Sequence, residues 1–199
     1  MSKLVLSGDT SGSVTLDAPA VSGTTILTLP TSSGTVTVAG VNSNIVSSTS
    51  QATTSGTSKD FTSIPSWVKR ITVMFSGVST NGSSFPQVQL GTSGGVVSSG
   101  YSSYAGYFTV SNQTTASSAT TGFHMHDGAA SSTRFGMMTI TNITGNTWTS
   151  NHTMGDVGGV VVFSGGGSIA LSGALDRLRI TTVNGTDTFD AGSVNILYE

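Results

Sequence analysis

Three histidines are the side chains of this sequence best suited to bind a metal ion. Residues 122–128 read GFHMHDG, so His124 and His126 are two positions apart, and His152 follows in TSNHTMGD. Alternate side chains of a strand share one face, which would place His124 and His126 roughly 7 Å apart. A zinc or iron site needs at least three ligands. The pair therefore predicts a metal site, which His152 or the His pairs of other copies on a threefold axis would complete. The alternative is that both are strand histidines without function.

A group of aromatic residues indicates a second kind of site, one for carbohydrate. Tyr101, Tyr104, Tyr107 and Phe108 lie close together in YSSYAGYF, and Trp148 lies in TGNTWTS. Aromatic rings with polar neighbours suit the faces of sugars. In small β domains, however, such rings more often fill the core or a subunit interface. Tyr101, Tyr104, Tyr107 and Trp148 are therefore candidate glycan-binding residues, with a core role as the competing interpretation.

Enzymatic chemistry lacks its usual parts. The acidic residues are scattered and the only glutamate is Glu199, so a glycosidase pair would need two distant aspartates. No Gly-x-Ser-x-Gly motif has a suitable strand-to-helix context. The run Gly165-Gly166-Gly167 is followed by no lysine and no helix, which favours a tight loop over a phosphate-binding loop. The sequence predicts a protein that is not an enzyme and has no cofactor.

Composition excludes several classes of partner. Only 8% of the 199 residues are charged and the net charge is -2, whereas a phosphate backbone requires a basic surface. There is no cysteine, so there is no disulfide and no thiolate metal site. No run of about 18 apolar residues is present, and the amino terminus does not resemble a signal peptide. We expect neither nucleic-acid binding nor membrane insertion.

The residue types predict an all-β protein. Val, Ile, Thr, Tyr and Phe recur throughout, and no window has the Ala, Leu, Glu and Lys mixture that favours helices. Several short strands at such spacing indicate a sandwich or a barrel. The predicted strands are residues 67–75, 85–90, 104–110, 133–141, 159–163, 175–183 and 193–198. We predict an antiparallel, jelly-roll-like β-sandwich over residues 59–199.

Alternation and turn residues refine this prediction. In WVKRITVMF, the face that carries Trp67, Ile71, Val73 and Phe75 is expected to be core. Leu178 and Ile180 alternate with polar residues in the same way. Asn-Gly is the strongest short hairpin signal, so Asn184-Gly185 predicts pairing of the segments on either side. Gly145-Asn146 is a weaker signal of the same kind.

The first 58 residues have a different character. Short Thr/Val/Leu strands in residues 1–40 end at Gly or Pro, and two or three such strands cannot bury a core. We therefore expect an arm that becomes ordered by pairing with another copy or another protein. Residues 41–58 are rich in Ser and Thr without sustained periodicity, which predicts a linker.

The two ends of the chain resemble proteins of tailed bacteriophages, in particular marine and cyanobacterial ones. SKLVLSGDTSGSVTLDAPAVSGTTILTLPTSSGTVTVAG is similar to an amino-terminal segment of their virion structural proteins. FTSIPSWVKRITVMFSGVSTNGSS and GALDRLRITTVNGTDTFDAGSVNILYE resemble a carboxy-terminal domain of phage tail fibre and virion structural proteins. These segments cover about half of the chain, and residues 85–170 match no pattern.

The resemblance implies a structural role on a virus particle. It implies a homotrimer on the virion surface, assembled in the host cytoplasm and bound to capsid or tail proteins through residues 1–40. We expect a non-enzymatic capsid decoration or short fibre. The alternative is a receptor-binding tail fibre or tip that recognises a host surface glycan. The clustered tyrosines and the His pair favour the alternative, whereas the short length and the lack of a repetitive shaft favour the first.

Overall fold

The chain divides into two units that are described separately. The structure is a computed structural model of all 199 residues, and it describes residues 3–7, 13–17, 45–109, 114–126, 128–158 and 161–199. Unit 1 is Met1–Asn42 and unit 2 is Ser43–Glu199. In unit 1, β1 (Lys3–Ser7) pairs with β2 (Ser13–Asp17) in an antiparallel ladder. The rest of the predicted arm, residues 18–40 included, lies outside the described residues.

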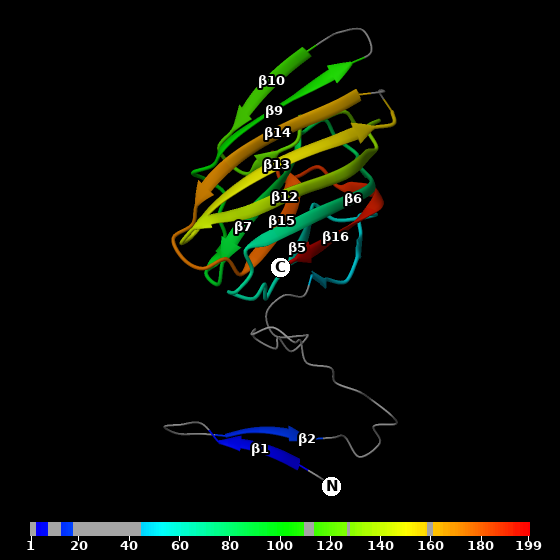
Figure 1. Cartoon of the computed structure of the whole chain (residues 1–199). Coiled ribbons are helices and arrows are strands. Elements are labelled where there is room, and N and C mark those ends of the chain that lie inside the picture. The colour runs from blue at the N-terminus through cyan, green and yellow to red at the C-terminus, as the bar shows by residue number, and fades with distance from the viewer. Residues whose placement is uncertain (1–2, 8–12, 18–44, 110–113, 127, 159–160) are drawn as a thin grey trace. The chain divides into compact units, whose positions relative to one another are not determined.

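Unit 2 consists of two antiparallel sheets (Figure 1). The large sheet has nine strands: β3 (Val46–Ser47), β4 (Gln51–Ala52), β6 (Arg70–Thr80), β9 (Ser102–Thr109), β10 (Thr114–Ala119), β12 (Arg134–Thr144), β13 (Thr147–Asp156), β14 (Val161–Ala170) and β16 (Phe189–Tyr198). The small sheet has five strands: β5 (Ser58–Phe61), β7 (Pro86–Thr92), β8 (Gly95–Val96), β11 (Phe123–His124) and β15 (Arg177–Thr182). The described residues contain no helix, which confirms the all-β, antiparallel prediction.

The strand order shows how the two sheets are connected. The large sheet has the order β10-β9-β14-β13-β12-β6-β16-β3, with β4 also pairing with β16, and the small sheet has the order β11-β7-β15-β5, with β8 also pairing with β7. Strands β12, β13 and β14 form a meander, whereas the chain crosses between sheets from β6 to β7 and from β15 to β16. All seven predicted segments overlap observed strands.

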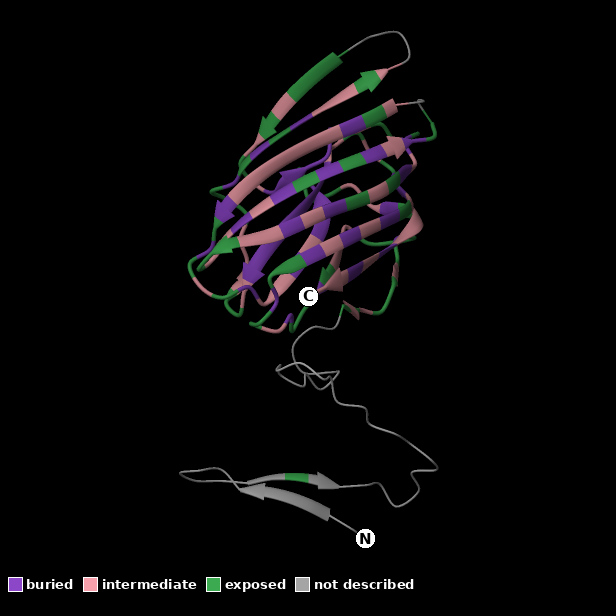
Figure 2. Cartoon of the chain, in the orientation of Figure 1, coloured by how far each residue is buried: buried purple, intermediate pink, exposed green. Residues whose placement is uncertain are grey.

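The core lies between the sheets and follows from strand alternation. Ile71, Val73 and Phe75 of β6 are buried, as predicted, and so are Leu178 and Ile180 of β15. They belong to one cluster with residues of both sheets. Figure 2 shows the alternation as buried and less buried residues in turn along the strands of the large sheet. Burial of one face of each sheet is the main stabilising contribution to the domain.

The prediction for Trp67 is wrong. Strand β6 begins only at Arg70, so the alternation does not extend back to Trp67. The side chain of Trp67 is 47% exposed, and Val68 is buried in its place. The turn at residues 66–67 breaks the alternation before β6, so that Val68 points inward and Trp67 does not.

The two turn signals have different outcomes. Gly145 has φ of 51°, and Gly145-Asn146 joins β12 to β13 as a hairpin, as predicted. Asn184-Gly185 also forms a tight turn, in which Gly185 has φ of 69° and its N–H donates to the Thr182 carbonyl. The predicted hairpin is nevertheless wrong, because β15 belongs to the small sheet and β16 to the large one. The turn carries the chain between layers.

The described part of the predicted linker is incorporated into the large sheet. Strands β3 and β4 both pair with β16. Thr53 is fully buried, its N–H donates to the Gly192 carbonyl and its hydroxyl donates to the Ala191 carbonyl. Backbone pairing with a long strand orders a segment whose side chains show no periodicity. The compact domain therefore begins before residue 59.

Candidate functional site

His124 lies in the interior between the sheets and is held by two hydroxyl groups. Its Nδ1 lies 3.1 Å from Ser103 Oγ, and its Nε2 lies 2.7 Å from Ser117 Oγ. The two serines come from β9 and β10, at the edge of the large sheet. Burial, together with the charge of His126, lowers the pKa of His124 to about 4. The imidazole is therefore neutral at pH 7 and links the two sheets.

His126 and His152 are buried beside aromatic rings. The His126 ring stacks on Tyr107, with centroids 5.2 Å apart, and lies 4.6 Å from the Phe85 ring. His152, on β13, contacts Phe163 edge-on. Among the described residues, neither ring nitrogen of His152 has a hydrogen-bond partner. Burial, and secondarily the charge of His124, lowers the pKa of His152 to about 4.

The metal site predicted at His124 and His126 is not assembled by the part of the chain that the structure describes. Within that part, no three His, Asp or Glu side chains are grouped as ligands of one ion would be. Both nitrogens of His124 face serine hydroxyls instead. Asp127, which follows His126, lies outside the described residues. Metal binding therefore stays a prediction.

Two of the four predicted glycan-binding residues are core residues. Tyr101 is buried, and its hydroxyl accepts from the Leu90 N–H at 2.7 Å and lies 3.1 Å from the Val97 carbonyl. Its ring contacts Phe123 edge-on. Trp148 is also buried, on the inner face of β13. Burial of both rings corrects the prediction that they bind a sugar face, because the rings pack within the core cluster and leave no face free for a sugar.

The other predicted rings lie on opposite faces of β9. Tyr104 is 66% exposed on the outer face, together with Phe108. Tyr107 points inward and packs against the core and His126. Strand alternation separates residues 104 and 107, so the four predicted residues form no common platform. Only Tyr104 of the four is available to a large ligand.

The glycine run is part of a strand and not the predicted tight loop. Gly165, Gly166 and Gly167 lie in the middle of β14. A Cβ on Gly165 would lie 2.7 Å from Cε1 of His152, and one on Gly167 would lie 3.1 Å from Phe123 Cδ1. These distances are too short for ordinary packing, so the glycines make room for the two rings.

A polar groove on the outer face of the small sheet is the site that sequence reasoning missed. It encloses about 320 Å³ and lies over β5, β7 and β15. Its lining residues are mostly amides and hydroxyls: Thr57, Ser58, Gln87, Gln89, Ser98, Thr121, Arg179, Thr181, Thr182, Val183, Asn184 and Gly185. The sequence signal was the polar half of the alternating segment QVQL at residues 87–90, which we had interpreted only as a strand.

Four of the carboxylates in the described residues have structural partners. Asp60 and Asp176 accept hydrogen bonds from Arg179 and Arg177. Asp156 accepts from the backbone N–H groups of Thr133 and Gly158, and Asp187 accepts from that of Ser84. Asp156 and Asp187 thus hold the backbone of loops in place.

Comparisons with known proteins give no family. No family model matches the chain, and neither a curated protein nor a solved structure matches it. In the described residues, no helix is long and apolar enough to cross a membrane.

Proposed function

We propose that this protein is a non-enzymatic structural protein of the virion surface of a tailed bacteriophage, a capsid decoration or a short fibre. Residues 1–40 anchor it to capsid or tail proteins, and the sandwich, of jelly-roll type, is displayed. The resemblance of both chain ends to phage virion proteins supports the class. The observation that carries the role is the division of the chain into unit 1, whose described residues form the β1–β2 hairpin, and the compact unit 2. An isolated two-stranded hairpin gains stability by pairing with a partner.

The outer face of the large sheet supports assembly with further copies. Phe108 of β9 lies opposite Val162 of β14, Val162 opposite Gly155 of β13, and Gly155 opposite Phe135 of β12. Phe108, Val162 and Phe135 are 58%, 50% and 42% exposed, and Met137 is exposed as well. These residues form an apolar band across four adjacent strands. Exposed apolar bands of this kind mark protein contacts.

The charge and size of this face fit a second copy of the chain. The outward residues of β9, β14, β13, β12 and β6 are uncharged apart from Arg70, which pairs with Glu199 at one end. Identical surfaces can therefore meet without like-charge repulsion. Five strands about 4.8 Å apart and about 30 Å long present roughly 700 Å², close to the roughly 800 Å² that each partner buries in a stable interface. We include self-association, as the homotrimer that the resemblance implies, in the proposal.

Immunogold labelling of virions tests the proposed location. An antibody against residues 59–199 would be applied to purified particles and imaged by electron microscopy. Label on the head identifies a decoration or head fibre, and label on the tail identifies a tail fibre. Intact particles without label, although the antibody recognises the isolated protein, would overturn the proposal.

The receptor-binding alternative loses its predicted residues. It relied on Tyr101, Tyr104, Tyr107 and Trp148, two of which are core residues and one of which packs against the core. We therefore do not propose glycan recognition through this set.

A further inference from the structure

We propose that the polar groove on the small sheet binds a neutral saccharide. This inference is independent of the proposed assembly role, because the groove and the apolar band lie on different sheets. It uses none of the residues that the sequence singled out for glycan binding. The way the lining side chains are held, their charge and the size of the groove all favour this class of ligand.

The amides of the groove are fixed before any ligand arrives. Gln87 donates from Nε2 to the Thr182 carbonyl at 3.3 Å, and its Oε1 accepts from the Thr121 hydroxyl at 2.8 Å. Gln89 donates from Nε2 to the Thr121 carbonyl at 2.8 Å. Both glutamines are buried, at 2% and 6% exposed, although they lie on the outer face and line the groove. Rotamers held in this way lose little entropy when a ligand binds.

Acceptor groups remain available in this network. Among the described residues, Gln89 Oε1 accepts no hydrogen bond, whereas Gln89 Nε2 donates to the Thr121 carbonyl. Thr181 donates its hydroxyl hydrogen to the Thr57 carbonyl at 2.8 Å, which leaves the lone pairs of that oxygen for a donor. Fixed acceptors of this kind suit the hydroxyl groups of a sugar.

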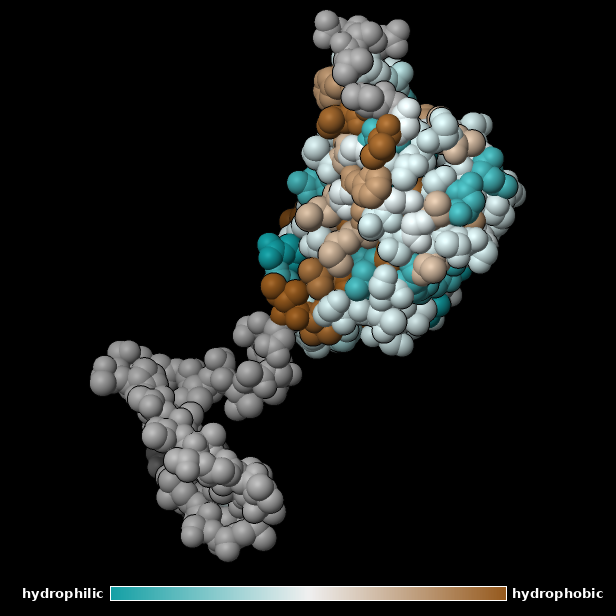
Figure 3. Space-filling view, turned by 90° about the vertical axis from the view of Figure 1, so that its right-hand side faces the viewer, coloured by the Kyte–Doolittle hydropathy of each residue, from teal (hydrophilic) through white to brown (hydrophobic). Residues whose placement is uncertain are grey.

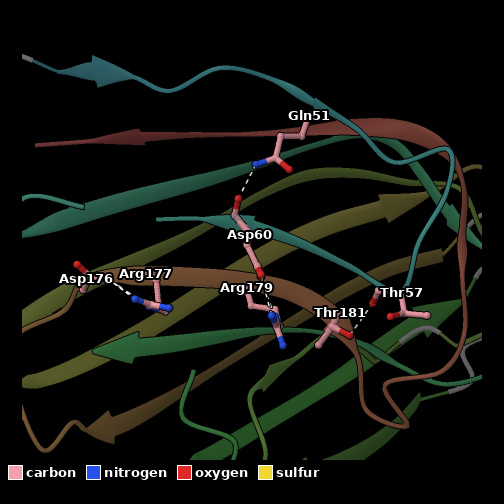
Figure 4. A network of polar contacts seen from close by, with 7 residues as sticks. All are labelled: Gln51, Thr57, Asp60, Asp176, Arg177, Arg179 and Thr181. Carbon is pink, nitrogen blue, oxygen red and sulfur yellow. Dashed lines mark hydrogen bonds and ion pairs between the residues drawn. The ribbon is translucent and has the colours of Figure 1, made fainter. Parts of the chain in front are cut away.

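The charges of the groove cancel. Arg179 donates from Nε and NH2 to the two carboxylate oxygens of Asp60, both at 2.7 Å. The Asp60 carbonyl in turn accepts from Gln51 Nε2 at 2.7 Å (Figure 4). The hydrogen bonds that Arg179 donates to the Asp60 carboxylate raise the pKa of Arg179, so the guanidinium stays charged beside a carboxylate of opposite charge. A groove without net charge gives an anionic or cationic ligand no electrostatic advantage.

The size and lining of the groove further restrict the class of ligand that fits it. Val183 is the only apolar side chain that lines it among the described residues, so an apolar ligand would gain little from burial. The volume of about 320 Å³ is at the lower end for small-molecule sites and suits one or two sugar rings. A neutral ligand rich in hydroxyl groups is the class that matches both properties.

Binding by the full-length chain to a panel of neutral mono- and disaccharides tests the proposal. NMR titration would follow the side-chain amide signals of Gln87 and Gln89 in the wild type. We expect at least one saccharide to shift these signals at millimolar concentration or below. In Gln89→Leu and Thr181→Val, calorimetry should then show an affinity at least 10-fold lower.

A matched control uses a second polar hollow, lined by Ser66, Ser93 and Ser172 among others. Ser172→Ala should leave saccharide affinity unchanged. If Gln89→Leu fails to fold, Thr181→Val and the wild-type amide shifts still decide the question. The proposal would be overturned if no saccharide shifted the glutamine signals, or if the only shifts were at Tyr104. It would also be overturned if the variants bound saccharide as tightly as the wild type, or if the protein bound only Ser/Thr-rich peptides. None of these outcomes bears on immunogold labelling, so the two proposals fail separately.

Discussion

The outer faces of the two sheets differ in chemistry although the inner faces share one core. On the large sheet, Phe108, Val162, Phe135 and Met137 are exposed among small neutral residues. The small sheet instead carries amides, hydroxyls and Arg–Asp pairs. In Figure 3, brown apolar surface gathers on the left, the side of the large sheet that faces the reader in Figure 1, and the right half is pale and teal.

This difference shows how a weakly charged chain can give its two outer faces different surface chemistry. Strand alternation commits every second residue to the core and leaves the other half free to vary. An apolar, uncharged face is suited to a protein contact, and a fixed polar face to water or a polar ligand. The predictions below test this division, beginning with the largest expected effect.

A charge in the apolar band should abolish self-association. In Val162→Asp, each copy of the proposed trimer would bury an unpaired carboxylate at the contact, and these groups together should weaken association by about a thousand-fold or more. Sedimentation equilibrium measures the change. Ser58→Asp, on the outer face of the small sheet, is the matched control and should associate like the wild type. Equal association of Val162→Asp and the wild type would remove the distinction between the two faces.

The interior shared by the two faces should be sensitive to acid. The pKa of His152 is about 4 in the folded protein, against about 6.5 in an unfolded chain. Between these values the unfolded state binds a proton that the folded state does not, so stability is full above pH 6.5 and falls as the pH drops towards 4. His152 alone should account for about 3 kcal/mol of this loss.

Urea denaturation of the wild type and His152→Leu at several pH values between 4 and 7 measures this effect. The variant should lose stability less steeply, and His124, whose pKa is also about 4, should account for part of the remaining slope. Parallel curves for the two proteins would mean that His152 does not titrate in this range.

The glycine run should be needed for the packing of the large sheet. In Gly165→Ala, the new Cβ would lie 2.7 Å from His152 Cε1 and 2.7 Å from Ala105 Cβ. We expect a loss of about 1–3 kcal/mol in the free energy of unfolding. Gly94→Ala is the control, because its nearest contact would be Thr92 Oγ1 at 3.5 Å. Thermal unfolding of both variants gives the comparison, and similar melting temperatures would contradict it.

The smallest expected effect on stability is at the ion pair of the polar groove. Arg179 and Asp60 are both more than one-third exposed. Arg179→Met should therefore change the free energy of unfolding by less than about 1 kcal/mol. It should nevertheless weaken saccharide binding, because Arg179 lines the groove and its side chain would be lost there. A large loss of stability would show that the pair supports the sheet itself.

Much of the fold could be predicted because alternation is a local property. Ile71, Val73, Leu178 and Ile180 were assigned to the core from their own segments. The choice of sheet is not local: Asn184-Gly185 has the chemistry of a hairpin turn, yet the strands on either side of it join different layers. Packing of both strands against distant partners decided the outcome.

The candidate sites were harder to predict, because burial decides which side chains a ligand can reach. The spacing of Tyr104 and Tyr107 showed proximity, but their odd separation places them on opposite faces. Gln87 and Gln89 lie in one alternating segment, strand β7. Their side chains are held by Thr121 and Thr182, which are distant in sequence. No single segment contains that information.

The pairing of β3 and β4 with β16 has a mechanical consequence. Tension applied through the amino-terminal unit would enter the domain at this attachment. Ser48 N–H donates to the Ile196 carbonyl, Thr53 N–H donates to the Gly192 carbonyl, and Asn195 donates to the Ser48 carbonyl. The applied force would be distributed over several hydrogen bonds along β16. Strand β16 in turn pairs along its length with β6, its neighbour in the sheet. A pull on the arm is therefore spread over the sheet before it reaches the core.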